Sequence, residues 1–73
     1  MASVIVKRIG ASDQTTEAAT VGEIKTKLNL SNYTADVKSP MNGESDYTVR
    51  GDNYELEDGD IVRLAQNTKG GKI

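Results

Sequence analysis

Residues 20–28 read TVGEIKTKL, and this run carries the clearest local signal in the chain. Thr20 stands three residues before Glu23, which is the spacing of a capping box at a helix N-terminus. Apolar residues follow at i, i+3 and i+7 on one helical face, namely Val21, Ile24 and Leu28. The pattern predicts a helix from about Val21 to Leu28 or Asn29. Because a helix of about ten residues is marginal alone, we expect its apolar stripe to pack on a sheet.

Strand patterns flank the helix on both sides. Runs of β-branched or alternating residues predict strands at Ser3–Ile9, Gln14–Ala19, Tyr33–Lys38 and Asp60–Ala65, and a short strand or loop around Glu44–Val49. Asn42-Gly43 predicts a type I′ hairpin turn, in which both central residues have positive φ. Asp58-Gly59 predicts the turn before the last strand. The side chains predicted to face inward from the first and last strands are Val4, Val6, Val62 and Leu64.

The order of these elements predicts an α+β fold. One helix follows two strands and precedes the others, so it can cover one face of a mixed four- to five-stranded sheet. The first and last strands are the most apolar, which favours parallel neighbours at the sheet centre. We expect a domain over residues 1–65, and a flexible C-terminal tail over 66–73 that contains Gly70-Gly71.

Composition excludes several classes of protein. The 73 residues predict one small domain. Without cysteine or histidine, the chain cannot build a disulfide framework, a thiolate zinc site or a triad based on these residues. Eleven acidic residues against nine basic ones argue against nucleic-acid binding. We expect no enzymatic activity, no cofactor and no metal, because no set of polar residues suggests a built site.

The apolar residues also bear on location. No apolar run reaches the length of a membrane span. Residues Met1 to Lys7 lack a basic leader and an apolar signal core. We therefore expect a cytoplasmic monomer that does not bind membranes.

Three stretches together resemble the ubiquitin-like β-grasp superfamily. Residues 20–28 resemble the capped helix of ubiquitin in their apolar and lysine pattern. Asn42-Gly43-Glu44 and the run Leu56 to Val62 resemble the sulfur carrier proteins of the thiamine and molybdopterin pathways. Nine residues from Ile61 to Lys69 then precede Gly70-Gly71, a spacing similar to that of those carriers. The resemblance covers nearly the whole chain and implies a β-grasp fold.

The resemblance also implies a function for the diglycine. Such carriers and modifiers present Gly-Gly as the C-terminus to an adenylating activating enzyme, and glycine suits a narrow channel because it has no Cβ. Here Lys72-Ile73 follows Gly71, so the expected processing bond joins Gly71 to Lys72 and a processing peptidase is an expected partner. The alternative is a β-grasp interaction module in a larger complex, whose tail is never activated.

The sheet offers a candidate partner-binding face. If the valines of the first strand face inward, Ile5 and Ile61 face away from the helix, where ubiquitin-like domains bind partners. We expect these isoleucines to form one patch with Ala65, rimmed by Lys7 and Arg63.

Two other groups of residues favour structural interpretations. An acidic cluster formed by Glu55, Glu57, Asp58 and Asp60 lacks the spacing of an EF-hand calcium loop, and a solvated turn is the favoured interpretation. The cluster also has the charge to steer a basic activating enzyme. Tyr33, Tyr47 and Tyr54 are expected in or beside the core rather than as a stacking platform.

Overall fold

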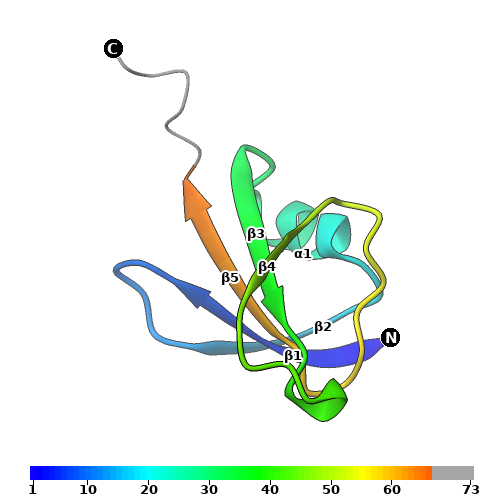
Figure 1. Ribbon diagram of the computed structural model, residues 1–73. Coiled ribbons are helices and arrows are strands. Elements are labelled where there is room, and N and C mark those ends of the chain that lie inside the picture. Colours follow the sequence, from blue (N-terminus) through cyan, green and yellow to red (C-terminus); the bar gives the residue numbers. More distant parts are fainter. Residues whose placement is uncertain (67–73) are drawn as a thin grey trace.

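Five strands and one α-helix make up residues 1–66, the part of the chain that the computed structural model describes (Figure 1). The elements in chain order are β1 (Ala2–Arg8), β2 (Gln14–Ala18), α1 (Val21–Leu28), β3 (Tyr33–Lys38), the 3₁₀ turn η1 (Pro40–Asn42), β4 (Thr48–Arg50) and β5 (Ile61–Gln66). The predicted α+β class, with a mixed five-stranded sheet and one helix, is confirmed. β5 includes Gln66, which was predicted to belong to the tail; the other residues of the predicted tail, 67–73, lie outside the described part.

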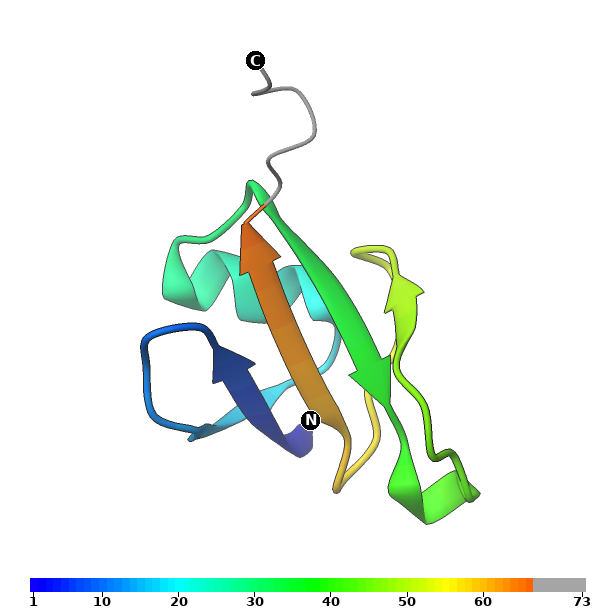
Figure 2. The same cartoon turned by 60° about the vertical axis from the view of Figure 1, so that its left-hand side comes forward.

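The strands form a single mixed sheet in the order β2-β1-β5-β3-β4. β1 and β5 run parallel, whereas the other three neighbouring pairs are antiparallel. The predicted parallel pair therefore exists, and β5 is the middle strand of the sheet (Figure 2). A parallel pair needs a crossover connection, and the chain between β1 and β5 includes α1, which supplies the helical layer.

Both ends of α1 follow from the residues there. Thr20 has extended backbone angles, φ −136° and ψ 164°, and its Oγ1 accepts a hydrogen bond from the Glu23 N–H at 3.3 Å. The Glu23 carboxylate in turn accepts a hydrogen bond from the Ala19 N–H, one residue before the cap. Asn29 ends the helix in the left-handed region at φ 60°, which asparagine tolerates better than most residues. The capping-box prediction is confirmed.

The loop after β4 holds the first turn of α1. Val21 N–H donates to the Tyr54 carbonyl at 3.1 Å, and Gly22 N–H donates to the Asp52 carbonyl at 2.9 Å. Lys25 Nζ forms an ion pair with Asp52 Oδ1 at 2.9 Å. Since these N–H groups are already paired, the start of α1 has no spare donors for a bound anion.

The core lies between α1 and the covered face of the sheet. Val4, Val6, Val62 and Leu64 are all buried there, as predicted. Ile24 and Val21 of the helix are both 0% exposed, so the predicted helical stripe packs on the sheet. Leu28 and Leu30 are partly buried against the same cluster.

The turn at Asn42-Gly43 differs from the prediction. Pro40 to Asn42 form a 3₁₀ turn, and only Gly43 of the two central residues has positive φ, at 80°. Proline fixes φ near the 3₁₀ value and so starts this turn. The Glu44 carboxylate then accepts a hydrogen bond from Ser39 N–H at 2.9 Å and closes the loop. As a result β4 begins at Thr48, later than the predicted Glu44.

Candidate partner-binding face

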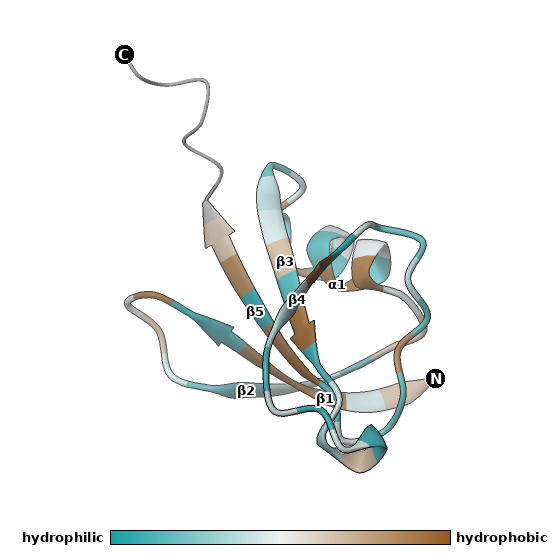
Figure 3. Cartoon of the chain, viewed as in Figure 1, coloured by the Kyte–Doolittle hydropathy of each residue, from teal (hydrophilic) through white to brown (hydrophobic). Residues whose placement is uncertain are grey.

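The predicted patch residues come together on the face of the sheet away from α1, called here the open face. The parallel register of β1 and β5 places Ile5 opposite Ile61, and Lys7 opposite Arg63. Their chain neighbours Val4, Val6 and Val62 are buried on the covered face. Because side chains alternate along a strand, the four residues share the open face. Figure 3 shows that both hydrophobic and hydrophilic segments occur along β3 and β5.

The apolar part of the open face is larger than the sequence predicts. Ile5 is 38% exposed and Ile61 is half-buried. Val49 of β4 is 66% exposed and pairs with Asp36, whose other neighbour across the sheet is Arg63. Paired residues point to the same side, so Val49 joins the open face.

Tyr47 also belongs to the open face, which corrects the expectation that it packs in or beside the core. Its ring centroid lies 4.2 Å from the Arg63 guanidinium carbon and 5.0 Å from Lys38 Nζ, both within range of a cation–π contact. Tyr33 and Tyr54, by contrast, pack against the core as expected. Tyr47 lies in the irregular segment before β4, where no strand alternation shows which way a side chain points.

Charged groups surround this apolar centre. Arg63 forms an ion pair with Asp36 at 2.9 Å, so its guanidinium is held by a carboxylate and by the Tyr47 ring together. Lys7 forms an ion pair with Asp13 at 2.8 Å. The hydrogen bond to Asp13 raises the pKa of Lys7, and the negative charge of Asp13 adds to the effect.

The end of β5 borders a small hollow. Ala65 is exposed, and with Leu64 it lines a pocket of about 230 Å³ together with Arg8, Ile9 and Tyr33. Ile9, in the turn after β1, is 95% exposed and was not singled out from the sequence. The predicted tail sites Gly70, Gly71 and Lys72 lie outside the described residues.

The acidic cluster divides into two kinds of residue. Glu55, Glu57 and Asp58 are exposed, as a solvated turn requires. Asp60 is 0% exposed, so the expectation of a solvated side chain is wrong for this residue. It shares the covered face with Val62 two residues later, and its Oδ2 accepts a hydrogen bond from Glu57 N–H at 3.0 Å. Within residues 1–66 no group of three or more acidic side chains is arranged to hold a metal ion.

No helix in the described part of the chain is long and apolar enough to cross a membrane.

Comparison with known proteins adds no assignment to these observations. The chain matches no protein-family model, no curated protein and no solved structure. What the protein does must therefore be inferred from its own residues.

Proposed function

We propose that this chain is a ubiquitin-like β-grasp protein, a protein modifier or sulfur carrier activated at Gly71 after removal of Lys72-Ile73. The observation that carries the proposal is the position of β5. This central strand holds Ile61, Arg63 and Ala65, and the same strand leads into the segment with Gly70-Gly71. A partner docked on the open face therefore contacts the strand from which the diglycine extends.

The tail supplies the reacting group in this proposal. A carboxylate oxygen of Gly71 attacks the α-phosphorus of ATP on an activating enzyme, and pyrophosphate leaves. A sulfur nucleophile of a partner then attacks the Gly71 carbonyl carbon, and AMP leaves with the bonding electrons. Five peptide units separate Gln66 from Gly71, so the chain can span at most about 18 Å beyond β5. That span lets Gly71 enter a channel while the domain stays folded outside it.

The open face supplies the docking contacts. Ile5, Ile61 and Val49 offer apolar area, and apolar area at the centre of an interface carries much of its affinity. Arg63 is held by Asp36 and Tyr47 before any partner arrives, so less side-chain freedom is lost on binding.

The second candidate is an interaction module whose tail is not activated. One observation favours it: Ile5, Ile61 and Val49, which come from three strands of the domain, form an apolar centre on the open face. In this alternative the domain binds its partner equally well with or without Gly70-Gly71.

Activation in vitro separates the two candidates. ATP–pyrophosphate exchange is measured with the activating enzyme of the same organism and three proteins: a chain ending at Gly71, the 73-residue chain, and a Gly71→Ala version of the shorter chain. We expect exchange with the first protein only, because a side chain beside the reacting carbon obstructs a channel shaped for glycine. Equal behaviour of all three proteins would favour the interaction module.

A further inference from the structure

A groove on the opposite side of the domain from the end of β5 is not used by the proposed function. It lies between the start of β1 and the segment before β5, and its volume is about 500 Å³. Its lining consists of Met1, Ala2, Ala19, Thr20, Glu55, Leu56, Glu57 and Asp58. Volumes of this size accommodate small ligands or single side chains of a partner.

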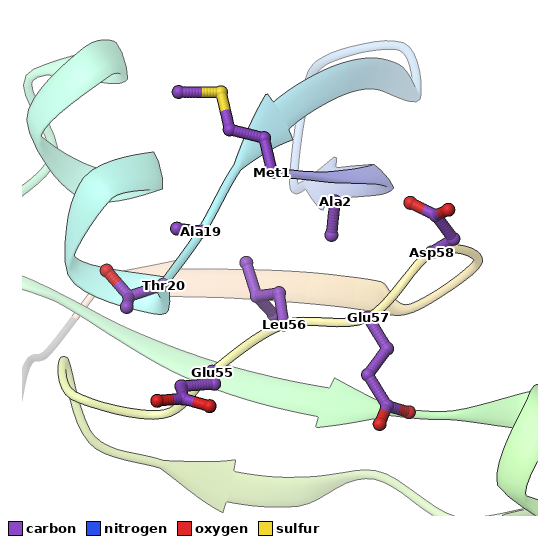
Figure 4. Close-up of a pocket in the computed structure, with 8 residues that line it drawn as sticks. All are labelled: Met1, Ala2, Ala19, Thr20, Glu55, Leu56, Glu57 and Asp58. Carbon is purple, nitrogen blue, oxygen red and sulfur yellow. The ribbon is translucent and has the colours of Figure 1, made fainter.

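One wall of this groove is apolar. Leu56 points toward Met1, Ala2 and Ala19, which come from two other parts of the chain (Figure 4). Leu56 and Ala2 are 8% and 4% exposed, so their packing fixes the shape of this wall. The Leu56 N–H donates to the Ala19 carbonyl at 2.9 Å and ties the two sides together. The groove is therefore built into the fold.

The other part of the lining is acidic. Glu55 and Glu57 extend from the side of their segment opposite to Leu56, and Asp58 lies beside Ala2 (Figure 4). None of these three carboxylates takes part in an ion pair among residues 1–66, whereas Asp13, Asp36 and Asp52 elsewhere each do. Asp58 Oδ1 accepts a hydrogen bond from Ser3 N–H and Glu57 Oε1 accepts one from Asn42; within residues 1–66 the second oxygen of each accepts none.

The surrounding sequence strengthens this charge. Residues 39–60 contain seven of the eleven acidic residues of the chain but only one of its nine basic residues, Arg50. The Arg50 side chain lies over the Tyr54 ring, at 4.6 Å from its centroid, and is not part of the groove lining. A strongly negative region attracts a positively charged partner and repels a negative one.

We infer that this groove docks a basic segment of a partner protein through a lysine or arginine side chain. Such side chains combine an apolar stem with a charged head. The stem lies on Ala2, Ala19 and Leu56, and the head reaches the carboxylate of Asp58 beside Ala2, while Glu55 and Glu57 add negative charge from the other side of the segment. The inference does not depend on activation at Gly71, because the groove uses neither the open face nor the tail.

The test uses the full 73-residue chain and a defined probe, the tripeptide acetyl-Lys-Leu-Lys-amide. Binding is followed by two-dimensional amide NMR as the peptide is added. We expect shifts concentrated at residues 19–20 and 55–58, and a weaker affinity as the salt concentration is raised from about 0.02 to about 0.3 M. A peptide with diaminopropionate in place of lysine keeps the charge but shortens the stem, and we expect it to bind more weakly.

Two matched variants locate the contact. Asp58→Asn keeps an oxygen acceptor for the Ser3 N–H, so it should fold normally and weaken binding about two- to fivefold. Glu57→Gln keeps an oxygen acceptor for Asn42 and should weaken binding less, because its side chain extends from the side of the segment opposite to Leu56. Asp46→Asn is the control, because Asp46 is exposed in the same acidic segment but does not line the groove, and its affinity should be unchanged.

Three outcomes overturn the inference. The first is an equal loss of affinity in Asp46→Asn, which means that only overall charge matters. The second is the same shifts with the acidic probe acetyl-Glu-Leu-Glu-amide. The third is self-association of the chain through the groove without peptide, seen as concentration-dependent shifts of residues 55–58, because the occupant is then a second copy of this protein.

Discussion

Replacing Ile24 with alanine tests the helix–sheet interface most sharply. Ile24 is 0% exposed and is the largest of the fully buried side chains. Truncating such a side chain removes its burial and leaves a cavity, which typically costs about 2–5 kcal/mol. A domain of this size has a free energy of unfolding of about 4–11 kcal/mol, taken from the usual range per residue. The substitution should therefore remove a large part of the total stability.

Urea unfolding followed by far-ultraviolet circular dichroism measures the loss. With a slope of about 1 kcal/mol per molar urea, the midpoint should fall by about 2 M or more. Ile24→Val is the graded comparison and should cost about 0.5–1.5 kcal/mol, because only one methylene group is lost. A cost below about 0.5 kcal/mol for Ile24→Ala would show that Ile24 does not pack in the core, and would refute the helix placement.

Three further predictions concern the cap, an ion pair and a turn. Thr20→Ala should lower the free energy of unfolding by about 1 kcal/mol in the same urea assay, because the cap to α1 is lost; no change would contradict the observed cap. Asp13→Asn should lower the pKa of Lys7, followed by NMR titration. Since that pKa is raised above its usual 10.5, any stability from the exposed pair is complete below this value and disappears as pH rises through the folded pKa; an unchanged pKa would show that the pair does not form in solution. Gly59→Ala should cost about 1 kcal/mol or more, because φ is +88° there. Gly51→Ala, where φ is not positive and no atom lies within 4 Å of an added Cβ, is its control; equal costs would contradict the strained turn.

The sequence alone predicts the elements of this fold well where a periodic pattern exists. The capping box at Thr20 and the apolar stripe through Ile24 gave α1 with its correct ends. Alternation in the first and last strands placed Ile5 and Ile61 on one face, and the register places them side by side. These features depend on local spacing, which a single sequence records directly.

Features that depend on distant residues were predicted poorly. Tyr47 stands in an irregular segment, and only contact with Arg63 and Lys38 on other strands sets its direction. Asp60 looks like part of a solvated acidic turn, yet directly before β5 it is buried, and its Oδ2 accepts a hydrogen bond from Glu57 N–H. At Asn42-Gly43, the preceding Pro40 and the side chain of Glu44 override the usual turn preference.

The groove, too, could be predicted only in part from the sequence. The carboxylates of Glu55, Glu57 and Asp58 are obvious in the sequence, but the wall of Ala2, Ala19 and Leu56 is not. It forms because β1, the end of β2 and the segment before β5 meet in space. A sequence pattern does not show that these three segments are neighbours, because this depends on the topology of the sheet.

The central claim, that Gly71 is the working C-terminus, is tested most directly by the intact mass of the protein purified from its native source without a tag. The account predicts a population whose chain ends at Gly71, either as a free acid, as a thiocarboxylate or joined to another protein. Native protein that retains Lys72-Ile73 in every detectable species, under conditions in which the activating enzyme is present, would contradict the claim.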